Sequence, residues 1–316
     1  MHPALSVIFF TTASGAGYGL LAWVAVAALT GALPARGLLV AIAMALVLVT
    51  AGLASSFLHL GKPARAWRAY SQWRTSWLSR EGVAATLTYA PVVALGMALL
   101  PAMLDGSGRG MPALGPWGIL VAVLAAVGAI ATLVCTAMIY ASLKPIPAWS
   151  HRSVPVVYLA FALSGGALLL AAIAAIVDGV MPAPGALVAL GLLALAPWPL
   201  KWRYWRDIDG TPLALQRGDA VGLPARTVRR FEGPTTEANY ITKEMGFVLA
   251  RRHATPLRVA AVVLFALVPV ACLALAAFAG RDPAWLALAA ASAIAGTFVE
   301  RWLFFAQARH MVTLYY

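Results

Sequence analysis

Long apolar runs, separated by short polar or basic stretches, dominate the sequence. Most hold about twenty residues, and a helix of that length crosses a hydrocarbon core of roughly 30 Å. The alternation of apolar and polar positions that typifies strands is not evident, which argues against a β-barrel. The pattern predicts an all-α integral membrane protein, a bundle of eight transmembrane helices forming a single domain over residues 1–316. The expected spans are 8–32, 37–59, 82–103, 115–143, 154–177, 184–200, 259–279 and 284–306.

Composition agrees with a membrane protein and limits its cofactors. Apolar residues make up 62% of the chain and charged residues only 11%, where soluble domains carry about 25% charge. Residues 1–7 contain no Lys or Arg, so the basic region of a cleaved signal peptide is missing and we expect the first span to be retained. Two cysteines, Cys135 and Cys272, cannot hold an iron–sulfur cluster or a four-ligand zinc site, and we interpret them as packing residues.

The basic residues predict an orientation. Of 23 Lys and Arg residues, three fall in the first, third and seventh connections, and the rest fall in the even-numbered connections or near the C-terminal end. By the positive-inside rule, both termini are then cytoplasmic. In this orientation almost all of the net charge of +12 lies on the cytoplasmic face. Such a face can attract anionic lipid headgroups or dock a partner subunit. Nucleic acid is not favoured, because the charges are spread over several loops.

The sixth connection, residues 201–258, is long and basic, and loops of this length usually have a function of their own. Within it, residues 235–252 could form a helix that lies on the membrane or against a partner, because four apolar residues follow helical spacing. The alternative is a mobile linker. The four residues are Ile241, Met245, Val248 and Leu249.

Ionisable residues near membrane depth are costly and tend to be functional. His59 ends the second span, Glu81 begins the third, and Glu300 and Arg301 lie near the end of the last, so all are expected close to the cytoplasmic boundary. A histidine and a carboxylate on adjacent helix ends suit a quinone site, since quinone chemistry moves two protons with two electrons. The alternatives are an interfacial His59, Ser79 and Glu81 as capping residues, and Glu300 and Arg301 in an ion pair with a neighbouring helix or reaching the interface.

Two other functions have to be considered. Haem ligation by two histidines fails, because none of the five histidines is expected in mid-span. A transporter stays open, because the glycines of residues 14–19 could mark a broken helix, although such glycines more often allow close helix packing. Carboxylates in mid-membrane, which ion coupling needs, are missing.

Four segments resemble the membrane anchor subunit family of dimethyl sulfoxide reductase, which includes the anchor of the quinone-linked sulfite dehydrogenase. They are residues 1–12, 58–66, 76–81 and 300–305. The block His-Leu-Gly-x-Pro-x-Arg-Ala, which begins at His59, is the most specific of them. The likeness runs over nearly the whole chain.

The resemblance implies an anchor in the bacterial inner membrane that holds a molybdopterin catalytic subunit and a four-cluster, ferredoxin-like iron–sulfur subunit. It implies that His59 and Glu81 bind quinol, an exchangeable substrate, while this chain carries no metal or redox cofactor of its own. We expect Arg65 and Arg301 to orient the quinone headgroup and Glu300 to relay protons. The long sixth connection looks more like the sulfite dehydrogenase branch, so the substrate and the direction of electron flow stay open, as does a purely structural anchor.

Overall fold

The computed structural model describes residues 4–104, 110–210, 215–224, 226–229, 231–232, 237 and 253–314, apart from the side chain of His59. Within them the chain is helical, and eight spans are long and apolar enough to cross a membrane, as the sequence predicts. Five spans are single helices: α1 (Leu5–Thr30), α2 (Ala35–Ser56), α3 (Trp77–Leu104), α4 (Pro116–Ala141) and α5 (Val154–Asp178). The others are α6 with α7 (Pro184–Leu195, Pro197–Gly210), α10 with η4 and α11 (Ala254–Val262, Val263–Leu267, Val268–Phe278), and α12 (Pro283–Ala306).

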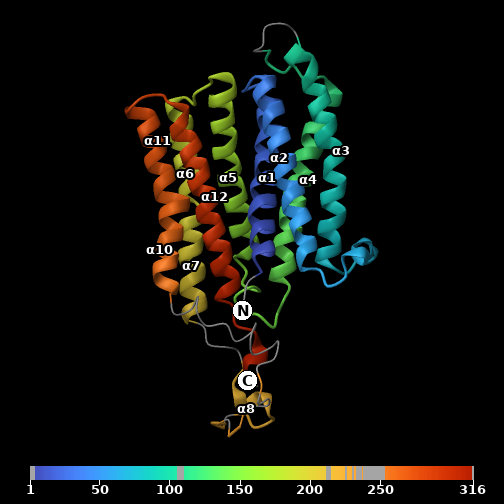
Figure 1. Cartoon of the computed structure of the whole chain (residues 1–316), viewed down its shortest axis with the longest axis vertical. Coiled ribbons are helices and arrows are strands. Elements are labelled where there is room, and N and C mark those ends of the chain that lie inside the picture. Colours follow the sequence, from blue (N-terminus) through green and yellow to red (C-terminus); the bar gives the residue numbers. More distant parts are fainter. Residues whose placement is uncertain are drawn as a thin grey trace.

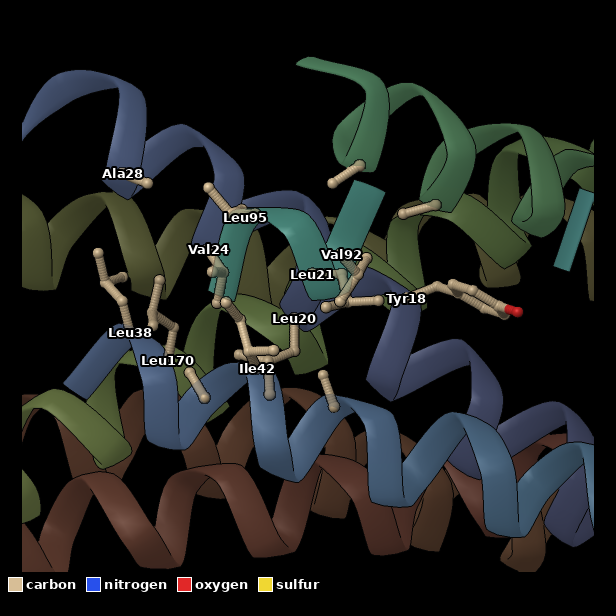
Figure 2. Close-up of a cluster of buried hydrophobic side chains, with 14 of the residues drawn as sticks. Tyr18, Leu20, Leu21, Val24, Ala28, Leu38, Ile42, Val92, Leu95 and Leu170 are labelled. Atoms are coloured by element: carbon tan, nitrogen blue, oxygen red, sulfur yellow. The ribbon is translucent and has the colours of Figure 1, made fainter. Parts of the chain in front are cut away.

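Helix α1 lies at the centre of the bundle, in contact with α2, α4, α5 and α12 (Figure 1). On one side α3 packs against α4 and α2; on the other, α12 packs against α5, α10 and α11. Figure 2 shows the apolar core that this arrangement creates, with α1 side chains meeting those of α2, α3 and α5. Its members include Leu20, Val24, Leu38, Ile42, Leu95 and Leu170.

The connections separate into two groups at opposite ends of the bundle. Helix α1 begins and α12 ends at the same end, which also holds α8 (Arg217–Ala220) (Figure 1). The connections after α2, α4 and α7 return the chain at this end, which we call the basic end because the predicted basic loops gather there. Of the described basic residues in connections, Arg281 lies at the opposite end, where it donates to the carbonyls of Met181 and Pro182. Which end is cytoplasmic stays a prediction.

Three predicted boundaries are wrong by five residues or more. The seventh span begins at Ala254 instead of residue 259. The third span begins at Trp77, and the backbone N–H of Ser79 donates to Ser76 Oγ, so Ser76 rather than Ser79 occupies the capping position. The sixth span continues to Gly210, because the basic residue Lys201 does not leave the bundle but is buried inside it. The helix predicted over 235–252 lies outside the described residues.

The glycines of α1 serve close packing, and the alternative of a broken helix is wrong, since α1 is continuous. Gly17 faces Ala45 and Val49 of α2, while Gly19 meets α5, where a Cβ on Gly19 would lie 1.8 Å from the carbonyl oxygen of Ala162. Small residues at such crossings let two helix backbones approach closely, which supplies much of the packing energy between membrane helices.

A second close crossing fixes the rotation of α12. A Cβ on Gly296 would lie 2.3 Å from the backbone nitrogen of Phe265 in the π-helical turn η4, and Ser292 Oγ donates to the carbonyl of Leu264 at 2.8 Å. The hydroxyl thus satisfies a carbonyl in the irregular turn. Glu300 follows Gly296 by four residues, so the same face of α12 points it into the bundle.

We predict that Gly19→Ala lowers the stability of the purified protein in detergent by about 1–3 kcal/mol, because the added methyl group overpacks the α1–α5 crossing. Thermal melting measures the effect. Gly15→Ala is the matched control on the same helix, since its Cβ would meet nothing within 4 Å. Equal melting temperatures for the two variants would contradict the packing role.

Candidate functional site

Glu81 lies in the second turn of α3 and is only 5% exposed. Its Oε1 accepts a hydrogen bond from Thr136 Oγ1 of α4. Counting residues from the nearby helix ends, Trp77 and Ala141, both groups lie about 6–8 Å inside the basic end. Glu81 is therefore not an exposed capping residue: it faces the neighbouring helix, and its carboxyl group is closed off from water.

The Thr136 hydroxyl can serve both protonation states of this carboxyl. The hydroxyl has one proton but two acceptors in reach, Glu81 Oε1 and the carbonyl oxygen of Thr132 at 3.0 Å. Thr136 donates to Glu81 when the carboxyl is ionised. When the carboxyl is protonated, it donates to Thr136 Oγ1, whose own proton turns to Thr132. A proton can thus arrive or leave without a buried polar atom losing its partner.

A second buried cluster joins three charged side chains from two helices. Lys201 Nζ of α7 lies 2.6 Å from Glu300 Oε1 of α12, and Arg301 Nη1 lies 3.5 Å from Glu300 Oε2. The three side chains are 1%, 0% and 2% exposed. With all three ionised, the cluster carries one positive charge in excess, buried within the protein.

Aromatic rings face the two cations. Arg301 Cζ lies 3.5 Å from the ring centre of Tyr158 on α5, and Lys201 Nζ lies 3.8 Å from that of Tyr204. The negative faces of such rings attract cations in place of water. Tyr204 in turn donates to the carbonyl of Ala148 at 3.0 Å, so the connection after α4 closes the bundle over the cluster.

A small cavity of about 20 Å³ separates the two clusters. It lies between α1, α4, α5 and α12 and has room for about one water molecule. Thr136, which donates to Glu81, contributes to its wall, and so does Arg301, which pairs with Glu300. Its polar lining residues include Thr11, Thr12, Ser14, Thr136, Thr297 and Arg301.

The other predicted site residues lie toward the membrane boundary. His59 ends the short helix η1 (Phe57–His59), and its side chain lies outside the described part of the chain. Arg65 is exposed on η2 (Pro63–Gln72), which packs against the start of α3, where Tyr70 and Thr86 share a hydrogen bond of 2.9 Å. The pairing of His59 with Glu81 therefore stays a prediction.

Lys201 is the site residue that the sequence interpretation missed. As the first charge after an apolar run, it fits the start of a loop equally well. The spacing of its neighbours could have identified it. Lys201, Tyr204 and Trp205 lie at positions i, i+3 and i+4, which places them on one helix face. In the structure all three side chains are buried.

His151 lies in the connection after α4, outside the spans. Its Nε2 is 3.4 Å from Asp207 Oδ2, and its Nδ1 is 2.7 Å from Ser153 Oγ. Burial lowers the pKa of His151, while the nearby Asp207 carboxylate acts in the opposite direction. The ring is thus mostly neutral at pH 7 and adds little to the positive charge of the basic end.

We predict that Lys201→Met destabilises the protein by about 3–5 kcal/mol, because it leaves the buried Glu300 carboxylate without its nearest cation. Thermal melting in detergent measures the change. Lys144→Met is the control, since Lys144 is an exposed lysine at the same end and its loss is expected to have little effect. A melting temperature for Lys201→Met equal to that of Lys144→Met would show that the buried pair is not needed for stability.

Comparisons with known proteins agree with this architecture. The sequence pattern of the family described as "DMSO reductase anchor subunit (DmsC)" matches residues 1–307. The C subunit of the sulfite dehydrogenase from Allochromatium vinosum is 34% identical over 328 residues, an alignment that covers 100% of this chain and 99% of the relative. These matches argue against the transporter alternative. The chain is a multi-pass membrane protein that belongs to the DMSO reductase anchor subunit family.

Proposed function

We propose that this chain is the anchor and quinone-reactive subunit of a molybdopterin oxidoreductase complex. It exchanges electrons between the quinone pool and an iron–sulfur subunit docked at the basic end. The observation that carries the proposal is the buried Glu81 carboxyl, which lies about one turn inside the bundle and has the Thr136 hydroxyl as its partner. A buried ionisable group at membrane depth is a functional-site hypothesis by default.

The chemistry of quinol oxidation fits such a group. A quinol gives up two electrons and two protons, so its binding site needs groups that take protons while the electrons pass to the partner's iron–sulfur cluster. In this proposal Glu81 takes one proton, and His59, which follows the end of α2 closely, hydrogen-bonds the headgroup. Arg65 orients the headgroup from the membrane surface. Arg301, the other residue expected to orient the headgroup, pairs with Glu300.

Charge supports docking at the basic end. Arg65, Arg68 and Arg74 are found on or beside η2, and Lys144 is exposed in the connection after α4. A partner with an acidic surface would be guided there. By the positive-inside rule this end faces the cytoplasm of a bacterial cell, so the complex would hang from the inner face of the inner membrane.

The relative bears on the substrate of the complex. Because identity to a sulfite dehydrogenase subunit extends over the full length, sulfite is the favoured electron donor, and electrons would flow from sulfite to quinone. Dimethyl sulfoxide reduction, with flow in the opposite direction, is the second candidate, favoured by the family description.

We predict that Glu81→Gln and His59→Arg abolish electron exchange with a quinol analogue while the complex still assembles. Glutamine keeps the size of the side chain but cannot take up a proton, and arginine fills the headgroup site with a fixed charge. Reduction or oxidation of the partner's iron–sulfur clusters, followed by absorbance after mixing with the analogue, measures the exchange.

Glu232→Gln is the matched control, because Glu232 is an exposed carboxylate outside the bundle, so its loss should leave exchange unchanged. Size-exclusion chromatography establishes that each variant complex is intact. Full exchange in both the Glu81 and the His59 variant would refute the site and favour a purely structural anchor.

We predict that membranes containing the intact complex reduce a quinone analogue when sulfite is added, and that a variant lacking this chain does not. The measurement is the absorbance of the quinone. Turnover of dimethyl sulfoxide with quinol, and none of sulfite, would select the second candidate.

A further inference from the structure

We infer that the cavity between α1, α4, α5 and α12 binds a small monovalent anion of about the size of chloride. The side chains of Thr12, Tyr158 and Arg301 hold this anion, which offsets the excess positive charge of the buried cluster beside it. Helices α1 and α5 each contact the other three helices, so the cavity lies inside the bundle (Figure 1). The inference goes beyond the proposed quinone chemistry and does not depend on it.

Three hydrogen-bond donors on the cavity wall lack an acceptor. Thr12 Oγ1, Tyr158 Oη and Arg301 Nε are buried and have no hydrogen-bond partner among the described residues. All three residues line the cavity, and each is at most 4% exposed. Tyr158 meets Arg301 through its ring, and a guanidinium group has no acceptor for the tyrosine proton. Because buried polar atoms are normally satisfied by protein, water or an ion, these atoms indicate a ligand in the cavity.

The other hydroxyl groups of the wall already donate elsewhere. Those of Thr11, Ser14 and Thr297 donate to carbonyls of their own helices. The hydroxyl of Thr136 donates to Glu81. The described residues that line the cavity include no Asp or Glu. The cavity thus presents free donors and no carboxylate, which favours an anion over a cation.

The charge of the neighbouring cluster points to an anion as well. Lys201 Nζ lies 2.6 Å from Glu300 Oε1, whereas Arg301 Nη1 lies 3.5 Å from Oε2, so the carboxylate is neutralised mainly by the lysine. Arg301 keeps its proton at all working pH values and cannot lose its charge by deprotonation. A buried charge needs a partner of opposite sign, and an anion in the cavity supplies one for Arg301.

The size of the cavity selects the anion. About 20 Å³ is room for one particle close to the size of water, and chloride is only slightly larger. Sulfate and organic acids are too large, since organic ligands occupy pockets of roughly 300–1,000 Å³. A neutral water molecule fits but would leave the charge of Arg301 unbalanced.

Thermal melting of the purified full-length protein in detergent tests the inference. The protein is purified in sodium gluconate, which is then replaced stepwise by chloride at constant ionic strength. We expect the melting temperature to rise by about 2–4 °C and to level off, because a ligand that binds only the folded state stabilises it. Bromide should act as chloride does, and sulfate should have no effect beyond that of gluconate.

Two variants locate the anion. Tyr158→Phe keeps the ring that faces Arg301 but removes the hydroxyl donor, and Thr12→Val keeps the shape of threonine without its hydroxyl. Each should need at least about tenfold more chloride for half of the melting shift, because one charge-assisted hydrogen bond to the anion is lost.

The matched controls keep the three donors of the cavity. Thr12→Ser retains the hydroxyl and should respond to chloride as the native protein does. Thr88→Val removes a buried hydroxyl of α3 that donates to the carbonyl of Ala84 at 2.7 Å and lies outside the cavity wall. Its chloride response should also be native.

Equal melting temperatures of the native protein in chloride and gluconate would overturn the inference, and so would a sulfate effect as large as that of chloride. A native chloride response in both Thr12→Val and Tyr158→Phe would place the anion elsewhere and overturn it too. If one of these variants does not fold, the other decides. Because no quinone takes part in the measurement, failure of the anion site leaves the proposed function standing, and failure of the proposed function leaves the anion site standing.

Discussion

Inside a membrane bundle a charged or hydroxyl side chain has no bulk water to bind, so it must find its partner within the protein. This constraint accounts for the internal architecture of the chain. Glu81 is held by Thr136 and Glu300 by Lys201 and Arg301, while hydroxyls such as Ser14 bond the carbonyls of their own helix. The helices are rotated so that Glu81 and Glu300 each meet a polar partner on another helix.

Close helix packing makes these meetings possible. Gly19 lets the backbones of α1 and α5 approach closely, and Gly296 does the same for α12 and η4. As a result, α1, α4, α5 and α12 pack closely around one small cavity. The same approach turns Glu300 toward Lys201. Dispersion contacts between backbones thus hold the bundle together and also set the electrostatics of its interior.

The bundle is divided along its length. Toward the end opposite the basic loops the largest apolar core is built from residues such as Val24, Leu38 and Leu95 (Figure 2). The Lys201–Glu300–Arg301 cluster and the hydroxyl-lined cavity lie in the half nearer the basic end. In the proposed function, proton exchange and the docked electron carrier share one side of the membrane, and the apolar half insulates them from the other.

The sequence itself determined the eight spans, the grouping of the basic loops at one end, and the energetic cost of burying Glu81, Glu300 and Arg301. It could do so because hydropathy and charge are properties of each segment alone. Tertiary structure decided which groups meet. Lys201 looked like the start of a loop until α12 supplied Glu300, and the capping alternative for Glu81 stayed open until α4 supplied Thr136. Pairing depends on the rotation of each helix and on its neighbours, and a one-dimensional pattern of apolar positions specifies neither.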